Sequence, residues 1–248
     1  MKKTLLACAI STVAMLPSLA NADVSATVGL VSDYTFNGIS QTDNAPALQA
    51  SLDYDSEAFY AGTWVSNVDF GEDLSGVNED TNIEWDFYAG KYFQVSQAFS
   101  IDTGIAYYTY HGQDNEDGRT ASDDNAYAEI YGKFGFASEF GQTEVNLWYA
   151  WDYFGFGDAH NVAMLAHSYD VAEGHTIRAS IDQSTFMDSD IKWDGNKSSY
   201  VHYRLAYETS YEGFDFEVAA EDTSIEEGPL DDRADARIVA GVSYNFGF

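Results

Sequence analysis

The sequence has 248 residues, of which 16% are aromatic, and its 41 acidic and 11 basic side chains give a formal net charge of −30 at pH 7. This charge argues against nucleic-acid binding, because a protein that neutralises phosphates needs a basic surface. The aromatic content argues against a disordered chain. The single cysteine, Cys8, leaves the rest of the chain without a disulfide, a cysteine-based metal site or a thiol nucleophile.

Residues 1–22 have the pattern of a secretory signal peptide. A short basic start, Met1-Lys2-Lys3, precedes an apolar run, and Ala20-Asn21-Ala22 provides an Ala-x-Ala cleavage site. We expect cleavage there, so that the exported protein consists of residues 23–248 as one all-β domain. No later stretch is apolar over the roughly 20 residues that a membrane-spanning helix needs.

The remaining sequence alternates between apolar and polar side chains. Ile83, Trp85 and Phe87, for example, are separated by Glu84 and Asp86, and such alternation is typical of a β-strand. Most of the alternating segments have the length of about 9–12 residues that crosses a bilayer as a tilted strand. The predicted strands are 23–35, 46–54, 59–68, 82–92, 99–110, 125–136, 143–153, 160–170, 175–184, 199–210, 214–222 and 235–248, and the two faces of 160–170 are the least distinct.

The connections between the predicted strands differ in length. The even-numbered connections are short, as in 55–58 and 211–213, whereas most odd-numbered ones are long and acidic, as in 69–81 and 223–234. Short turns at one end and long polar loops at the other are typical of outer-membrane barrels with periplasmic termini. We therefore predict an all-β fold, a single antiparallel transmembrane β-barrel of about 12 strands with both termini in the periplasm.

Aromatic side chains gather near both ends of the predicted strands, where a membrane barrel carries its aromatic girdles. The members are Tyr54, Phe59, Phe93, Phe99, Phe136, Phe214 and Tyr244 near the short turns, and Trp85, Tyr107, Trp151, Tyr153 and Tyr203 nearer the long loops. The final residues, Phe246 and Phe248, continue the alternation to the end of the chain. They resemble the signal that bacterial outer-membrane proteins present to the barrel assembly machinery.

Two parts of the sequence carry a family resemblance. The first comprises Ser32–Thr42, Pro46-Ala47, Asp53-Tyr54 and Phe59–Phe70, and the second is Glu84–Gly90. These segments resemble the TorF-like family of proteobacterial outer-membrane porins. The resemblance implies a porin-like barrel and names no solute. Members of that family commonly have arginine before the glycine of the first loop, where this sequence has Asn37.

The histidines make an outer-membrane hydrolase one alternative. His202 is predicted to face inward on the same strand face as Arg204 and Glu208. A hydrolase needs a nucleophile, a base and an orienting group within hydrogen-bond reach, and the sequence has no Gly-x-Ser-x-Gly or comparable motif. We therefore expect neither a catalytic site nor a cofactor.

The acidic loops make cation binding a second question. Residues 190–195 partly match the start of an EF-hand loop, but Lys192 occupies a ligand position and Val201 stands where the bidentate glutamate is required. That motif predicts no metal site. Diffuse Ca²⁺ or Mg²⁺ binding, which would bridge the loops to lipopolysaccharide phosphates, and simple solvation of the charges are the two interpretations left open.

The residues that carry function in a barrel channel are those that line its lumen. Alternation assigns charged side chains to the inward face, because an Arg or Lys facing lipid at the midplane would cost about 2–4 kcal/mol. The predicted pore-lining residues are Glu84, Asp86, Asp102, Glu129, Lys133, Glu144, Asp152, Arg178, Asp182, His202, Arg204, Glu208, Asp215, Glu217, Glu221 and Arg237. Carboxylates dominate this set, so we expect cation preference, unless Arg178, Arg204 and Arg237 form a positive ring at one constriction.

The sequence thus predicts a diffusion channel for small polar solutes or ions in the outer membrane of a Gram-negative bacterium. Its expected partners are outer-membrane lipid, lipopolysaccharide and the barrel assembly machinery. A second interpretation is a barrel whose charged lumen side chains form a closed plug and which serves a structural or adhesion role. The barrel hydrolase is the third.

Overall fold

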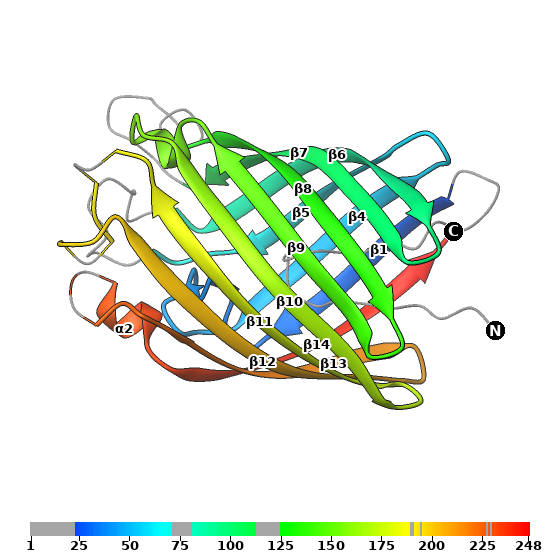
Figure 1. Cartoon of the computed structure of the whole chain (residues 1–248). Coiled ribbons are helices and arrows are strands. Elements are labelled where there is room, and N and C mark those ends of the chain that lie inside the picture. Colours follow the sequence, from blue (N-terminus) through cyan, green and yellow to red (C-terminus); the bar gives the residue numbers. More distant parts are fainter. Residues whose placement is uncertain are drawn as a thin grey trace.

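The computed structural model describes residues 23–70, 81–112, 125–188, 191–193, 195–226, 228 and 230–248. The predicted signal peptide, residues 1–22, lies outside the described residues. Twelve strands form a closed antiparallel barrel, which confirms the predicted fold class (Figure 1). They are β1 (Asp23–Val31), β4 (Ala47–Asp55), β5 (Tyr60–Asn67), β6 (Ile83–Ser96), β7 (Phe99–His111), β8 (Tyr127–Ser138), β9 (Gly141–Ala150), β10 (His160–Ala172), β11 (His175–Phe186), β12 (Ser199–Tyr211), β13 (Phe214–Thr223) and β14 (Arg237–Gly247).

Pairing between the first and last strands closes the barrel. Ser25 lies opposite Gly247, and the register continues to Val31 opposite Gly241. An unpaired backbone N–H or C=O costs several kcal/mol in lipid, where no water can replace the missing partner. Closure removes the free sheet edge, so the barrel satisfies the backbone requirement of a membrane-spanning structure.

The two faces of the sheet are chemically opposite. In β6, Ile83 and Phe87 are 40% and 44% exposed on the outer surface, whereas Glu84 and Asp86 are 2% and 3% exposed inside. The same alternation runs through β12 and β13, where Leu205 and Val218 point outward. The outer surface is therefore apolar over the strands, as lipid contact requires, and the ionisable groups are inside.

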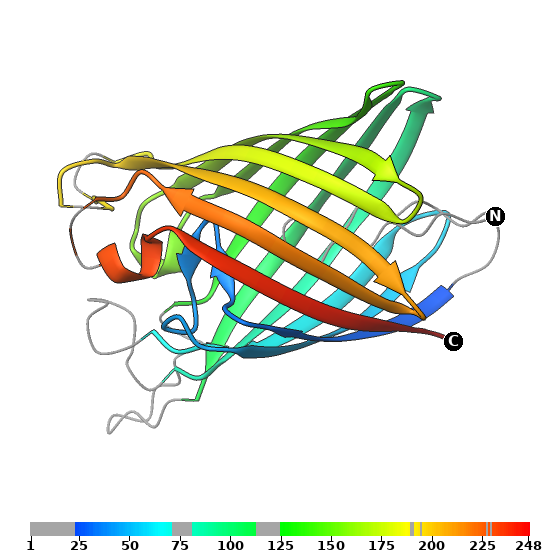
Figure 2. The same ribbon diagram turned by 90° about the horizontal axis from the view of Figure 1, so that it is seen from below.

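The two ends of the barrel differ. The hairpins that join β4 to β5, β6 to β7, β8 to β9, β10 to β11 and β12 to β13 are short, and we call their side the turn end. β1 begins and β14 ends on that side, whereas the short helix α2 (Asp231–Ala234) lies at the opposite side, the loop end (Figures 1 and 2). Neither of the helices in the described residues has the length and hydrophobicity to span a membrane.

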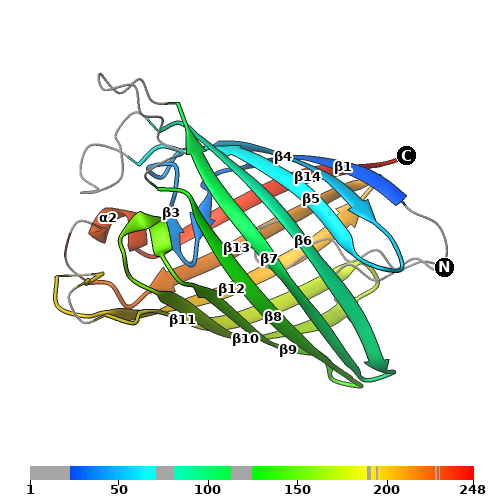
Figure 3. The same ribbon diagram turned by 90° about the horizontal axis from the view of Figure 1, so that it is seen from above.

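A short hairpin projects into the barrel after β1 (Figure 3). β2 (Thr35–Phe36) and β3 (Ile39–Ser40) pair with each other, and Asn37 and Gly38 between them have φ angles of 50° and 81°. Two successive positive φ angles are typical of the tight type I′ turn, for which Asn-Gly is the preferred sequence. We call Thr35–Ser40 the inserted hairpin. The predicted first strand, 23–35, was therefore too long, because the chain leaves the barrel wall after Val31.

The wall also ends earlier than predicted at β9. The strand stops at Ala150, and a 3₁₀ helix, η1 (Tyr153–Gly155), turns the chain inward with Phe154 at a φ of 53°. Tyr153 is buried, so its predicted place in the aromatic girdle was wrong. By contrast, the ambiguous segment 160–170 belongs to a regular strand of 13 residues, β10.

Aromatic side chains fill the loop end of the lumen. Tyr110 stacks on Phe154 with ring centroids 4.9 Å apart, and Phe186 stacks on Trp193 at 4.5 Å. The buried cluster also contains Tyr34, Trp64, Phe70, Tyr108, Tyr127, Tyr153 and Tyr200. This packing gives the barrel a closed core at the loop end, while several inward side chains at the turn end are partly exposed.

Candidate channel constriction

Most of the predicted pore-lining side chains lie on the inward face. Each alternates along its strand with a more exposed apolar neighbour. The residues so placed are Glu84, Asp86, Asp102, Glu129, Lys133, Glu144, Arg178, Asp182, His202, Arg204, Glu208, Asp215, Glu217, Glu221 and Arg237. Several of them, including Glu84, Asp86 and Glu129, are buried within the lumen.

Asp152 is the one member of the predicted set that lies elsewhere. It follows the end of β9, is exposed, and accepts a hydrogen bond of 2.8 Å from the backbone N–H of Gly157. The alternation had been extended past Ala150, where the strand ends. Asp152 therefore stabilises the turn around η1 and is not part of the inward wall.

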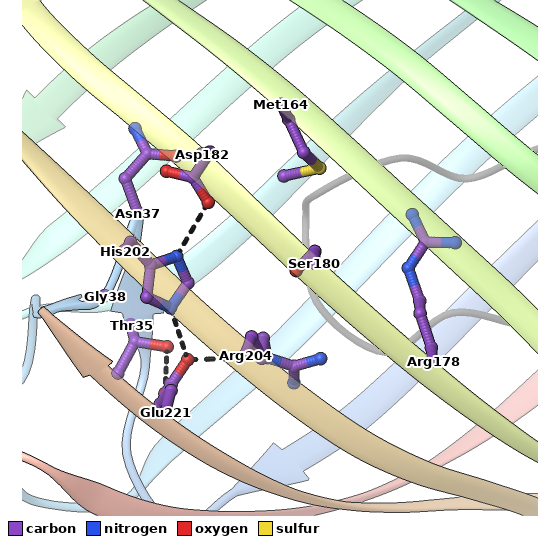
Figure 4. Close-up of a pocket in the computed structure, with 10 residues that line it drawn as sticks. All are labelled: Thr35, Asn37, Gly38, Met164, Arg178, Ser180, Asp182, His202, Arg204 and Glu221. Carbon is purple, nitrogen blue, oxygen red and sulfur yellow. Dashed lines mark hydrogen bonds and ion pairs between the residues drawn. The ribbon is translucent and has the colours of Figure 1, made fainter.

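A small cavity lies between the inserted hairpin and the inward faces of β10, β11, β12 and β13 (Figure 4). Its volume is about 30 Å³, which is room for about one water molecule. The hairpin contributes Thr35, Asn37 and Gly38, and the wall contributes Met164, Arg178, Ser180, Asp182, His202, Arg204 and Glu221. This cavity is our candidate for a constriction in the described part of the lumen.

His202 forms the centre of the wall opposite the hairpin tip. Its Nδ1 lies 2.8 Å from Oδ2 of Asp182, and its Nε2 lies 3.2 Å from Oε2 of Glu221 (Figure 4). The opposed register of β11 and β12 places Asp182 directly beside His202. We call Asp182, His202 and Glu221 the His202 bridge. It links three neighbouring strands through charged or polar side chains.

The inserted hairpin is held against this bridge by close contacts. Thr35 Oγ1 donates a hydrogen bond of 2.8 Å to Oε1 of Glu221, and the hydroxyl of Tyr200 donates one of 3.0 Å to the carbonyl of Asn37. A Cβ atom added to Gly38 would lie 2.5 Å from Cδ2 of His202 and 2.7 Å from Cγ2 of Thr223. Two features therefore require glycine at position 38: the positive φ angle, and the close approach of its Cα to His202 and Thr223.

Ion pairs hold the base of the hairpin to the connection between β13 and β14. Arg237 Nη1 lies 2.6 Å from Oδ2 of Asp33, whose other oxygen accepts a hydrogen bond of 2.6 Å from Ser40 Oγ. Arg233, in α2, pairs with Asp43 at 3.0 Å and donates to the carbonyl of Ser40. The hairpin is thus tied to the wall at both its base and its tip.

The arginines of the predicted positive ring are divided between two places. Arg178 and Arg204 both line the cavity, whereas Arg237 lies at the base of the hairpin. Arg178 contacts Glu144 through two hydrogen bonds of 3.1 and 2.9 Å, and Arg204 contacts Glu217 in the same two-pronged way. Such pairing offsets the positive charge, so the cavity has no unopposed arginine cluster among the described residues.

The opposite wall carries carboxyl groups beside tyrosines. Tyr110 donates to Glu84 at 3.2 Å, and Tyr108 donates to Glu129 at 3.1 Å. Tyr34, just after β1, packs its ring edge-on against Trp64 at 5.3 Å. Burial raises the pKa of Tyr34 well above its usual range, and the nearby Glu84 and Asp86 add to the effect. Its hydroxyl therefore stays protonated on this wall at neutral pH.

Three tyrosines lie inward toward the turn end. Alternation in the sequence predicts this for Tyr88, whereas Tyr60 and Tyr131 are missing from the prediction. The Tyr60 hydroxyl donates to Asp102 at 2.6 Å and contacts the Tyr131 hydroxyl at the same distance, while Tyr88 bonds to Asp53. The ammonium group of Lys133 lies over the Tyr131 ring, 4.6 Å from its centroid. Strand alternation also places Tyr60 and Tyr131 inside, but apart from Tyr88 the predicted inward set contains only acidic, basic and histidine side chains.

His202, the histidine that the sequence places on the inward face, lacks the surroundings of a hydrolase base. Both nitrogens of His202 face carboxylate oxygens, so neither faces a hydroxyl nucleophile. His160 is buried beside Tyr153 and Trp193, with ring centroids 4.2 and 5.6 Å away. Within the described ranges, no group of three His, Asp, Glu or Cys side chains is arranged to hold a metal ion. Two positions of the EF-hand-like stretch, 190 and 194, lie outside the described residues.

Several solved outer-membrane barrels share this fold. The NanC porin matches with a TM-score of 0.57 and 9% identity over 90% of this chain and 98% of its own. The KdgM porin matches with a TM-score of 0.53 and 12% identity over 90% and 99%. An outer-membrane channel from Pseudomonas putida F1 matches with a TM-score of 0.54 and 9% identity over 93% and 97%. At these identities the similarity concerns the fold.

Sequence comparison gives the family. No curated protein matches the sequence at a significant level. A model of the Gcw_chp family, described as bacterial proteins of unknown function, matches residues 18–234. This match covers the inserted hairpin and the barrel strands from β1 to β13, and it ends before β14. The chain therefore belongs to the Gcw_chp family of bacterial proteins.

Proposed function

We propose that this protein is a narrow channel of the bacterial outer membrane for small polar solutes or ions, and that the passage runs beside the inserted hairpin. The closed barrel with its apolar outer face supports a membrane location. The porins and the channel with the same fold support the same class of function. The resemblance of Ser32–Phe70 to TorF-like porins agrees with it.

The observation that carries this proposal is the polar nature of the lumen on both sides of the constriction. Lys133, Arg178 and Arg204 lie inward on β8, β11 and β12, with carboxylates on the adjoining strands. A purely structural core gains little from such groups, since well-packed apolar residues of similar volume are often equally or more stabilising. Charged walls instead suit a lumen that exchanges ions and water.

The size of the cavity sets the expected conductance. A space of about 30 Å³ admits about one water molecule, so a larger solute passes only when the hairpin moves. The polar contacts between the hairpin and this wall are two hydrogen bonds, from Thr35 to Glu221 and from Tyr200 to the carbonyl of Asn37. Water can replace such contacts when the hairpin leaves the wall. We therefore propose a small conductance while the inserted hairpin contacts the wall, which we call the seated state.

We propose that the channel prefers cations. Carboxylates remain more numerous than basic side chains on the inward face even without Asp152, and Asp53, which faces the lumen beside Tyr88, adds to them. A wall with fixed negative charge concentrates cations and repels anions, and the effect weakens as salt rises. One KdgM porin structure contains oligogalacturonate. A polyanion of this kind is a poor candidate solute for a chain of net charge −30.

The proposed setting includes lipid, lipopolysaccharide and the export machinery. Residues 1–22 would direct export, and Phe246 and Phe248 would be read by the barrel assembly machinery. The short turns and both termini of the barrel would then face the periplasm, and the loop end would face outward. Divalent cations bridging acidic loop residues to lipopolysaccharide phosphates are part of the same proposal.

A filled barrel with a structural or adhesion role is the second candidate. The observation that favours it is the aromatic cluster at the loop end, in which Tyr110, Tyr127, Phe154 and Trp193 are all buried. A filled barrel would carry its function on the loops and conduct no current. An enzymatic role has weaker support, because both nitrogens of His202 are occupied by carboxylates.

Current recordings on refolded protein in planar bilayers test the proposal. We expect small, discrete current steps from the unaltered protein. A variant that displaces the hairpin from the wall, such as Gly38→Val, should give larger steps. Absence of steps from both proteins, with the refolded barrel verified in the same membranes, would support the filled barrel instead.

A further inference from the structure

The two contacts of His202 require a specific protonation state. A neutral imidazole carries one N–H and one lone pair. The lone pair would then point at a carboxylate oxygen, either Oδ2 of Asp182 at 2.8 Å or Oε2 of Glu221 at 3.2 Å. Only the imidazolium ion donates a hydrogen bond to both carboxylates. With both carboxylates ionised, the bridge therefore requires a protonated ring.

The bridge is connected directly to the inserted hairpin. Glu221 uses Oε2 for His202 and Oε1 for the hydroxyl of Thr35. The ring of His202 also forms the surface on which Gly38 rests, with no room for a Cβ atom between them. A shift of either Glu221 or the His202 ring must therefore change the position of the hairpin tip.

The other charged groups around the ring come from its own and the neighbouring strands. Asp182 on β11 and Glu221 on β13 flank it, and Arg204 on β12 reaches Glu221 at 3.4 Å. Arg178 on β11 lines the same cavity, paired to Glu144. The side chains that the hairpin contributes, Thr35 and Asn37, do not titrate. Among the described groups at this contact, imidazole is the one whose ordinary titration range is near neutral pH.

We propose that His202 is a proton-controlled latch for the inserted hairpin. In its protonated form His202 holds Asp182 and Glu221 together, and Glu221 holds Thr35. When the ring loses a proton to water, one carboxylate loses its donor and faces a lone pair. That buried carboxylate then gains from moving toward water, and the hairpin tip is released. The inference rests on the proposed function, because the latch controls passage through the same constriction.

The direction of the pH effect follows from the sign of the charge. The bridge is complete when imidazole is protonated, at the lower pH, and is lost as pH rises. Rising pH should therefore release the hairpin and widen the passage. Strong acid should also weaken the bridge, because protonated Asp182 and Glu221 no longer attract the imidazolium ion. The test is confined to the range from about pH 6 to about pH 9, where carboxylates stay ionised.

A cysteine placed beneath the hairpin reports release without a need for current. Ser180 lines the cavity, and Ser180→Cys changes one atom of the side chain. We expect a small cationic thiol reagent to modify this cysteine faster as pH rises, relative to Ser96→Cys in an exposed turn. A thiol in the cavity and an exposed thiol ionise at different pH, so each rate is divided by the thiolate fraction of its own cysteine before the ratio is taken. The ratio should rise by about tenfold over the range, which corresponds to ~1.4 kcal/mol. A constant ratio would overturn the latch.

Replacement of His202 tests whether this side chain causes the pH dependence of labelling. In Ser180→Cys with His202→Gln, the modification rate relative to Ser96→Cys should be high at every pH. His167→Gln, in β10, is the matched control. His167 bonds to Thr143 and to the carbonyl of Phe140, away from the hairpin, so this variant should keep the pH dependence. Equal pH dependence with and without His202 would contradict the proposal.

Current recordings separate the latch from the proposed function. Conductance should rise with pH more steeply in the unaltered protein than in His202→Gln, which keeps every other titratable group of the lumen. If no variant conducts but the labelling ratio changes with pH, the channel function fails while the latch holds. If current flows at a level that does not depend on pH and the labelling ratio is constant, the latch fails while the channel function holds.

Discussion

Gly38 in the inserted hairpin and His202 in β12 meet with no space between them for a single additional carbon atom: a Cβ on Gly38 would lie 2.5 Å from Cδ2 of the imidazole. This contact brings the tip of the inserted hairpin against β12. The turn at Asn37-Gly38, where both φ angles are positive, therefore affects the width of the lumen.

A larger residue at the hairpin tip should widen the passage. We expect Gly38→Val to displace the hairpin from His202 and to increase single-channel conductance at least about twofold, since the constriction admits only about one water molecule. Gly174→Val is the control, because Gly174 has a φ of 75° but nothing within 4 Å of its Cβ position. Unchanged conductance in a folded Gly38→Val protein would show that the hairpin does not limit flow.

The ion pair at the hairpin base should stabilise the seated state. Arg237→Gln leaves Asp33 without its arginine partner, and both side chains are largely buried. Loss of one partner of such a pair costs about 3 kcal/mol, so we expect more frequent openings in current traces and a lower urea midpoint for unfolding. Arg237→Lys keeps the positive charge, so its opening frequency and urea midpoint should lie between those of the unaltered protein and of Arg237→Gln. A variant with unaltered gating would show that the tip alone holds the hairpin.

The outward face should reject charge. Val218→Arg places a cation against lipid at a position that is 49% exposed on β13, which costs roughly 2–4 kcal/mol near the midplane. The folded fraction, measured from the shift in gel mobility between unboiled and boiled samples, should fall. Glu208→Gln, on the inward face of β12, should leave it nearly unchanged. Equal loss in both variants would mean that the outer face is not in lipid.

The last residue should matter for assembly rather than for export. Phe248 is 81% exposed at the end of the chain, so Phe248→Ser removes little packing. We expect a lower yield of folded barrel in cells with undiminished delivery to the periplasm. Phe140→Ser, at a turn residue that is 69% exposed, is the matched control and should assemble normally. Comparable yields of the two variants would remove Phe248 from the assembly signal.

The barrel wall could be predicted from sequence because lipid and lumen impose opposite chemistry on successive residues. That constraint acts on every residue of a spanning strand, so all twelve strands appear as alternating segments. Residues beyond the ends of the wall strands do not separate lipid from lumen, so they need not alternate. The chain after Val31 and after Ala150 turns inward, and alternation alone did not distinguish Tyr153 in a packed core from Tyr153 in a girdle.

The inserted hairpin was harder to predict because its partners are distant in sequence. Thr35 and Glu221 are 186 residues apart, and Asn37 and Tyr200 are 163 apart. Alternation places His202 and Glu221 on an inward face, but does not say which loop lies against them. The Asn37-Gly38 pair was the available local signal, since this dipeptide favours a tight hairpin turn. It indicates the turn and not its direction into the lumen.

The reversal potential of single channels under a tenfold KCl gradient tests the central claim most directly. A lumen whose inward carboxylates outnumber its basic groups should give the sign for cation preference, and the preference should weaken as both salt concentrations rise and the Debye length falls below about 10 Å. Glu144→Gln and Glu217→Gln should reduce it. An anion-selective sign, or a potential of zero from a conducting barrel, would contradict the account.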